Sequence, residues 1–407
     1  MPVGWMDLRR KLFWVSVLYF AEGFPFGVAI DNLPVYFRLH GVSLTEIGLM
    51  SLLGAPWTLK VLWAPLVDRF GTRQHWFVSC LVALALIMAV LPLFNPSAPT
   101  IWLWAVLVLL TTASATQDIA IDAYTIGLLV PGEEGIANGV RVSAYRVALI
   151  ASGGGLVILA GVLGWTASFL LGATILTGLA VLAGRSPAVR VPPTDPQQNW
   201  FTPLLRWLQR PGAPMVFLFV LTYKLGESSM GPMIKPFWVD RGLTVGEIGL
   251  ISTTLGVGAS IAGALAGGAL TTRWGIFRAL WVLGLIQASS HLGYAGVAHF
   301  ELGRPGIYAA SLCESFAAGL ATAAFLAFLM HVCDKRRAAT EYALLSAIFG
   351  FTRSVAGGFS GWGTTHLGYA VYFGLTFLLA LPAFALLPWV KPWAEAAAET
   401  VPEPHAG

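Results

Sequence analysis

The stretch "GVSLTEIGLMS" (residues 41–51) has a near copy, "GLTVGEIGLIS" (residues 242–252), that begins 201 positions later. Six of the eleven aligned positions are identical, from the glycine at the start to the serine at the end. Each copy opens the second apolar segment of its half of the chain. A repeat of this kind, in the same order and direction, predicts a chain built from two parallel halves.

The composition indicates that the solvent of this chain is lipid. Of the 407 residues, 57% are hydrophobic and 11% are charged, whereas an average soluble domain has about 25% charged residues. Hydropathy divides the chain into twelve apolar segments of about 20 residues or more, and each could cross a hydrocarbon core of about 30 Å. Backbone groups cannot stay unpaired in hydrocarbon, so such segments must be helices. They are expected near 12–37, 44–66, 75–94, 100–129, 136–160, 164–183, 213–238, 245–270, 277–297, 305–332, 339–362 and 367–390.

Positive charges are unevenly distributed over the predicted loops. With both termini in the cytoplasm, fifteen Lys and Arg residues fall on the cytoplasmic side, and only Arg38, Arg241 and Arg304 on the other. This imbalance predicts cytoplasmic termini and leaves no basic patch for a nucleic acid. Arg9, Arg10 and Lys11 precede the first span without a cleavage site, so we expect that span to be retained.

Four regions follow from these spans. We expect a six-helix bundle over 1–183, a cytoplasmic linker with a short interfacial helix over 184–212, a second bundle over 213–391 and a cytoplasmic tail over 392–407. Two six-helix bundles joined in this way resemble the major facilitator superfamily, whose repeats surround a site at the membrane midplane. The predicted fold is therefore an all-α membrane protein with twelve transmembrane helices in two parallel six-helix repeats.

The loop after the second span carries the segment "APLVDRFGTR" (64–73), which is similar to a signature of that superfamily. An ion pair at a helix end can bias a two-state equilibrium. We expect gating roles for these residues and for a lysine near the cytoplasmic end of the same span; an ordinary solvated loop is the alternative. The residues are Lys60, Asp68, Arg69, Gly71 and Arg73.

The segment "TQDIAIDAY" (116–124) places two carboxylates in an otherwise apolar helix. Asp118 and Asp122 are four residues apart and so share one face. We expect Asp118 to face Arg146 near mid-depth. We expect Asp122, one turn nearer the cytoplasm, to face Lys60.

Other ionisable and polar residues fall near span centres, where each buried charge is costly unless it is paired or faces water. Such groups are either structural ion pairs or a proton and substrate site. Prolines and glycines beside two of the carboxylates favour bent helices that line a cavity. The candidate proton-coupling or substrate residues are Glu22, Gln117, Asp118, Asp122, Tyr145, Arg146, Lys224, Glu227, Gln287, His291, Glu314 and Arg353. We expect the groups at mid-depth to form one polar layer between the bundles.

Segments spread over nearly the whole chain resemble the AmpG muropeptide permeases and their acetyl-CoA transporter relatives. They include "LTEIGLMSLLGAPWTLKVLWAPLVDRFG" (44–71), "ATQDIAIDAY" (115–124), "YRVALIASGG" (145–154), "YKLGE" (223–227) and "CESFAAGLATAAFLAFLM" (313–330). The resemblance implies proton-coupled uptake, across the inner membrane, of a bulky polar solute such as a disaccharide peptide from peptidoglycan. Positions that match family motifs are Lys60, Asp68, Gln117, Asp118, Asp122, Tyr145, Arg146, Lys224, Glu314 and Arg353.

Other classes of protein are less compatible with the sequence. It contains no Walker loop, HExxH motif or nucleophile elbow, so we expect neither an enzyme nor an ATP-driven pump. Cys80, Cys313 and Cys333 have no metal-binding spacing, and we expect no metal and no cofactor. A siderophore permease of the same branch and a non-transporting receptor or scaffold remain alternatives. The expected partners are a small solute, protons and the lipid bilayer, and the expected state is a monomer.

Overall fold

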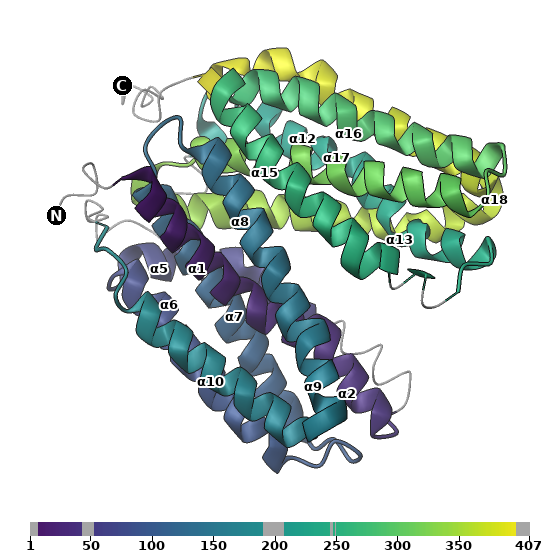
Figure 1. Ribbon diagram of the computed structural model, residues 1–407. Coiled ribbons are helices and arrows are strands. Elements are labelled where there is room, and N and C mark those ends of the chain that lie inside the picture. The colour runs from purple at the N-terminus through teal and green to yellow at the C-terminus, as the bar shows by residue number, and fades with distance from the viewer. Residues whose placement is uncertain (1–6, 43–52, 190–206, 245–246, 249, 396–407) are drawn as a thin grey trace, which may run out of the picture. The chain divides into compact units, whose positions relative to one another are not determined.

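The computed structural model describes residues 7–42, 53–189, 207–244, 247–248 and 250–395. Figure 1 shows that these residues form long helices. Most of the repeated stretch 41–51 lies outside the described residues, as do three positions of its copy. Most of the predicted linker and most of the predicted tail also lie outside them, so the interfacial helix expected in the linker stays a prediction.

The described residues form two compact units. Unit 1 is formed by the described residues of Met1–Leu129, Ala144–Trp200 and Lys335–Ala343. Unit 2 is formed by those of Val130–Ser143, Phe201–Asp334 and Leu344–Gly407. Each unit therefore contains a short segment from the opposite half of the sequence. The domain boundaries predicted at 183 and 213 stay a prediction.

Unit 1 is organised around α7 (Ile101–Leu128), which packs against α1 (Leu8–Gly27) and α6 (Arg73–Val90). α6 also packs against α10 (Trp165–Ala183). The segment predicted as the second span is broken where it is described. Its parts are α4 (Ala55–Leu59), η4 (Lys60–Leu62) and α5 (Ala64–Arg69). The remaining elements are η2 (Val28–Asn32), α2 (Leu33–Leu39), η5 (Leu91–Leu93), part of α8 (Glu134–Leu149), η6 (Ile150–Gly155), α9 (Leu156–Leu163), η8 (Lys335–Arg337) and the start of α18 (Ala338–Glu395).

Two π-helical segments of unit 1, η2 and η6, pack against each other. The side-chain amide of Asn32 donates to the carbonyl oxygen of Ser152 across this contact, at 3.3 Å. A Cβ atom at Gly153 would lie 3.0 Å from Cβ of Asp31. π-helical turns occur frequently at functional sites. Here η2 follows Glu22 on α1, and η6 follows Tyr145 on α8, by one to two helical turns.

In unit 2, α15 (Gly256–Trp274) packs closely against α17 (Arg304–His331). A Cβ atom at Gly263 would lie 2.0 Å from the carbonyl oxygen of Phe316, and one at Gly267 would lie 2.4 Å from that of Leu320. Small residues allow membrane helices to approach this closely. The other helices of unit 2 are α12 (Ala213–Tyr223), α13 (Leu225–Asp240), η7 (Leu250–Leu255), α16 (Ile276–His299) and the remaining parts of α8 and α18.

Single glycines reverse the chain between neighbouring helices. Gly164 (φ 84°, ψ 161°) ends α9 and begins α10, and Gly275 (φ 82°, ψ 155°) does the same between α15 and α16. This backbone region is essentially restricted to glycine. The sequence positions of these glycines therefore determine where the helix pairs turn.

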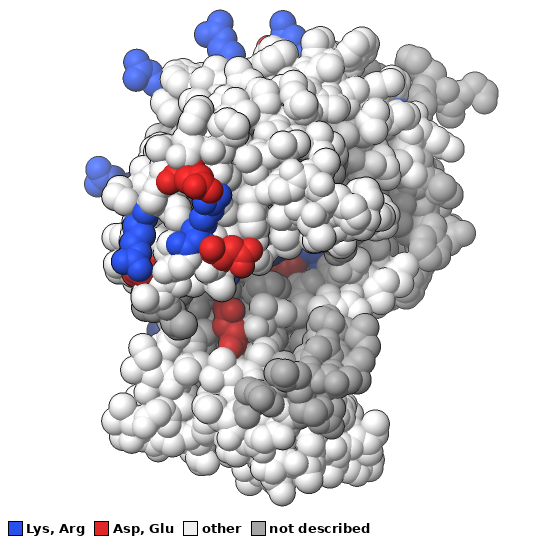
Figure 2. Space-filling view, turned by 90° about the vertical axis from the view of Figure 1, so that its right-hand side faces the viewer, with Lys and Arg blue, Asp and Glu red and all other residues white. Residues whose placement is uncertain are grey.

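Seven helical stretches in the described residues are long and apolar enough to cross a membrane. One of them, Lys335–Glu395, contains a break at Gly368 (φ 70°) that separates two helices within α18. Large apolar side chains on these helices point outward; Ile158, for example, is 72% exposed. Most of the described surface visible in Figure 2 carries no charged side chain, as expected for a surface that faces lipid.

Candidate functional site

Three carboxylates converge inside unit 1. Glu22 on α1 and both Asp118 and Asp122 on α7 each have an oxygen within 4.8 Å of the other two. Glu22 is 5% exposed and Asp122 is 2% exposed. The four-residue spacing on α7 directs Asp118 and Asp122 toward the same side of that helix, as predicted. Carboxylate oxygens at this separation could hold a cation. In this structure the positive charge beside them belongs to a side chain.

That cation is the ammonium of Lys60, which is 5% exposed at the start of η4. Lys60 forms an ion pair with Asp118. The sequence placed Lys60 opposite Asp122; the structure forms the ion pair with Asp118, and Asp122 lies near enough to attract the ammonium as well. Asp122 also accepts a hydrogen bond of 2.7 Å from the hydroxyl of Tyr19 on α1. The expectation assumed a straight second span, whereas the helix breaks at Lys60.

Two further hydrogen bonds hold α7 in place beside the carboxylates. The side-chain amide of Gln117 donates to the carbonyl oxygen of Ala21 at 2.9 Å, and the indole of Trp63 donates to the hydroxyl of Thr116 at 3.1 Å. Gln117 is fully buried. Its amide therefore ties α7 to the turn of α1 that carries Glu22.

Tyr145 and Arg146 come to unit 1 from α8, and both are half-buried. Tyr145 packs directly on α1, since a Cβ atom at Gly23 would lie 2.8 Å from the carbonyl oxygen of Tyr145. The structure therefore brings α8 to the same turn of α1 as the carboxylates. The pairing of Arg146 with Asp118 stays a prediction.

Unit 2 contains a second polar cluster, centred on Lys224. This lysine is 2% exposed and lies at the break between α12 and α13. Its ammonium donates to Glu227 (2.5 Å), to the side-chain oxygen of Gln287 (3.0 Å) and to the hydroxyl of Thr322 (2.8 Å). The amide of Gln287 also donates to Glu227. An ammonium has three N–H donors, and all three have partners here.

Glu227 and Thr322 are the half-buried members of this second cluster. The side chain of Glu227 is 32% exposed, compared with 2% for Lys224. Gln287 lies on α16 and Thr322 on α17. The ammonium of Lys224 therefore holds the Glu227 carboxylate and connects α13, α16 and α17.

His291 lies next to this cluster on α16 and is 1% exposed. Its Nδ1 atom lies 3.3 Å from the hydroxyl of Thr376, and a Cβ atom at Gly226 would lie 3.1 Å from its Cε1 atom. Its Nε2 atom has no hydrogen-bond partner among the described residues. The ring is thus packed against the first turn of α13, beside Glu227.

The last two candidates lie farther along their helices. Glu314 is half-buried on α17, about two turns before Thr322. Arg353 is exposed on α18. The polar layer predicted to join all the mid-depth groups includes residues of both units, and it stays a prediction.

The loop motif forms a compact polar contact within unit 1. The carboxylate of Asp68 accepts hydrogen bonds from the backbone of Ala339 (3.2 Å), from the backbone of Thr340 (2.8 Å) and from the hydroxyl of Thr340 (2.7 Å). Arg73 donates to Asp68 at 3.4 Å and to the carbonyl oxygen of Lys335 at 2.7 Å. Burial raises the pKa of the Asp68 carboxyl, although the Arg73 guanidinium and the Thr340 hydrogen bonds oppose this effect.

Arg69 and Gly71 complete the motif. Arg69 is exposed, with its guanidinium 5.7 Å from the ring centre of Phe70. Gly71 has a positive φ of 67°, and it turns the chain between α5 and α6.

Sequence reasoning missed the partners Tyr19, Thr322, Lys335 and Thr340. A tyrosine or threonine in an apolar helix gives no distinctive signal, because its hydroxyl can also bond to its own helix backbone. Lys335 contributes a backbone carbonyl, which no residue type could reveal.

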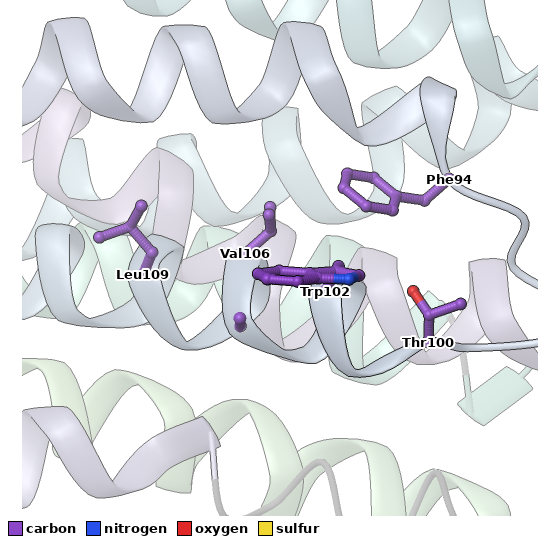
Figure 3. Close-up of a pocket in the computed structure, with 6 residues that line it drawn as sticks. Phe94, Thr100, Trp102, Val106 and Leu109 are labelled. Carbon is purple, nitrogen blue, oxygen red and sulfur yellow. The ribbon is translucent and has the colours of Figure 1, made fainter.

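A pocket of about 430 Å³ at the start of α7 does not suit a polar solute. Figure 3 shows Trp102 and Phe94 facing it with other apolar side chains. The lining residues are Phe94, Thr100, Trp102, Ala105, Val106 and Leu109. Leu109 precedes Asp118 by nine residues, or about 13 Å along a helix. The pocket is therefore separate from the carboxylates.

Membrane-length helices that enclose buried ion pairs are typical of a polytopic membrane transporter. The model of the Major Facilitator Superfamily matches residues 12–223. The chain is 32% identical over 381 residues to the anhydromuropeptide permease of Escherichia coli (strain K12), covering 91% of this chain and 78% of that protein. The chain belongs to the major facilitator superfamily and is a transporter of a small-molecule solute, not an enzyme.

Two further comparisons agree with this family. The chain is 27% identical over 399 residues to putative transporter AmpG 4 of Rickettsia conorii, covering 94% of this chain and 96% of that protein. The crystal structure of the E. coli fucose:proton symporter FucP superimposes with a TM-score of 0.72 over 96% of this chain and 100% of that chain, at 12% identity. This likeness shows the fold, which is the predicted all-α membrane fold of the superfamily.

Proposed function

We propose that this protein is a proton-coupled secondary transporter that takes up a bulky polar solute, such as a muropeptide derived from peptidoglycan, across the inner membrane. The observation that carries the proposal is the buried cluster of Glu22, Asp118 and Asp122 with the ammonium of Lys60. We further propose that the protein works as a monomer with both termini in the cytoplasm.

The cluster is suited to coupling because three carboxylates share one site with a single lysine ammonium. Binding a proton to one carboxylate removes its negative charge and changes which carboxylate attracts Lys60 most strongly. Since Glu22, Lys60 and the aspartates lie on different helices, a change of partner is transmitted to helix positions. Buried ionisable groups in membrane segments commonly mark such proton pathways.

The choice of solute rests on charge and on similarity. Each unit by itself holds charges of both signs: carboxylates with the Lys60 ammonium in unit 1, and Glu227 with Lys224 in unit 2. A solute that carries both amine and carboxylate groups complements such a cluster better than a simple anion or cation. The similarity over 91% of the chain to a protein named anhydromuropeptide permease supports a peptide-bearing sugar as the solute.

The Asp68 contact supports alternating access as the transport mechanism. Asp68 and Arg73 bind the backbone of Lys335, Ala339 and Thr340, which are remote in sequence. We propose that this contact forms in one transport state and breaks in another. A contact of this kind gives the two-state element that alternating access requires.

The test is proton movement in liposomes that contain the purified protein and an internal pH-sensitive dye. Adding an anhydromuropeptide outside should acidify the interior for the natural protein. Asp118→Asn and Glu22→Gln should reduce this signal at least tenfold, because each removes a proton-binding carboxylate.

Glu301→Gln is the matched control. Its side chain is 78% exposed, so the same chemical change there should leave proton movement unaltered. Undiminished solute-dependent acidification in both Asp118→Asn and Glu22→Gln would show that the carboxylate cluster does not couple protons.

A further inference from the structure

Three half-buried aromatic side chains form a cluster in unit 1: Phe26 on α1, Trp57 on α4 and Tyr145 on α8. The rings of Phe26 and Trp57 meet edge to face, with centroids 4.9 Å apart and planes at 74°. The rings of Phe26 and Tyr145 lie 5.9 Å apart at 48°. Three separate helices thus contribute one ring each to this aromatic cluster.

Two of the rings lie close in sequence to an ionisable candidate. Phe26 follows Glu22 by four residues, which places both side chains on the same face of α1, one turn apart. Trp57 lies in the middle of α4, which ends directly before Lys60. Tyr145 packs on α1 at the glycine that follows Glu22. The aromatic cluster and the carboxylate cluster are therefore neighbours.

The exposure of these rings differs from that of a packing cluster. Elsewhere in unit 1, Tyr36 and Phe169 form an aromatic contact in which the two residues are 6% and 0% exposed. Phe26, Trp57 and Tyr145 each keep accessible surface, although Glu22 and Lys60 beside them are only 5% exposed. Aromatic surface therefore stays accessible beside the buried charges, where a solute can contact it.

We infer that Phe26, Trp57 and Tyr145 form a subsite for a pyranose ring of the transported solute. This inference rests on the proposed function and adds to it the chemical group that the unit 1 site recognises. One face of a pyranose consists of C–H groups, which pack against aromatic rings, and its hydroxyls point outward from the ring edge. Ligand sites combine aromatic walls with a few polar groups in this way. A purely aliphatic occupant would leave the neighbouring ionisable groups without complementary contacts.

The subsite is tested by measuring how tightly the purified protein binds three probes: an anhydromuropeptide, its free disaccharide and its free peptide. Trp57→Ala should weaken binding of the first two about tenfold, which is the scale of an aromatic contact. Binding of the free peptide should not change. Trp57→Phe, which keeps a ring and guards against a folding defect, should weaken sugar binding less than about threefold.

Trp102→Ala is the control, since that indole is 72% exposed at the apolar pocket of α7 and should not affect any probe. Equal losses for peptide and disaccharide, or no loss for either, would overturn the subsite while leaving the proposed solute intact. If the natural protein binds only the intact anhydromuropeptide, equal affinities of Trp57→Ala and Trp57→Phe for that probe would overturn the subsite. If the natural protein binds none of the probes, the proposed function and the subsite both fail.

Discussion

Replacing Lys60 with methionine removes the ammonium from the carboxylate cluster of unit 1 and leaves a side chain of similar length. Lys60 is 5% exposed, and its partner Asp118 keeps 13% of its side-chain surface. Removing one partner of a buried ion pair typically costs about 3–5 kcal/mol, because the other charge stays buried without compensation. We expect a loss of this size in the unfolding free energy of Lys60→Met, measured by SDS titration in mixed micelles.

The double variant Lys60→Met/Asp118→Asn distinguishes this explanation from a simple packing defect. Removing both charges also removes the uncompensated one, so the double variant should be at least about 1.5 kcal/mol more stable than the sum of the single changes predicts. Lys60→Met/Asp122→Asn serves as the matched comparison, because Asp122 is bound by Tyr19. The Lys60–Asp118 pairing would be refuted if the stability losses simply add in Lys60→Met/Asp118→Asn while Lys60→Met/Asp122→Asn is more stable than the sum of its single changes.

Three further predictions concern other contacts, each measured as the unfolding free energy in the same micelles. Thr340→Val should cost about 1–2 kcal/mol, because Asp68 loses its hydroxyl donor at 2.7 Å. Gly263→Val should cost about 3 kcal/mol or prevent assembly, because its Cβ atom would lie 2.0 Å from a backbone oxygen of α17. Thr322→Val should cost about 1–3 kcal/mol, because the buried ammonium of Lys224 loses one of its three acceptors.

Two control substitutions serve these three changes, one for the threonines and one for the glycine. Thr365→Val removes an exposed hydroxyl that binds only its own helix at Gly361, and it should have little effect. Gly258→Val is the control for Gly263→Val, because Gly258 also lies on α15 but a Cβ atom there would meet nothing within 4 Å. A threonine or glycine variant no less stable than its control would contradict the corresponding contact.

The helices and their membrane character could be predicted because apolar length and the cost of unpaired backbone groups leave few alternatives. Within the carboxylate cluster, the shared face of Asp118 and Asp122 followed from helical spacing alone. The partner of Lys60 did not, because α4, η4 and α5 interrupt the span and move the lysine off the line of a straight helix. Breaks of this kind depend on tertiary packing, which local sequence describes poorly.

In the cluster around Lys224, too, the residues could be predicted but not their contacts. Lys224 and Glu227 were recognisable as charges in a span, and Gln287 as a polar residue near the centre of another span. The role of Lys224 was not recognisable, since only the structure shows that its three donors are used by Glu227, Gln287 and Thr322. The sequence left open whether Lys224 is a proton-coupling or substrate residue or part of a structural ion pair, and the structure adds the three protein acceptors that its ammonium contacts.

The one-residue turn at Gly164 bears on how the protein is made. With both termini in the cytoplasm this turn lies on the outer side of the membrane, and it leaves no loop between the two helices that could be threaded across a bilayer separately. We therefore expect α9 and α10 to enter the lipid together as a hairpin. A bulky substitution at Gly164 should then lower the yield of membrane-inserted protein before it affects any step of solute movement.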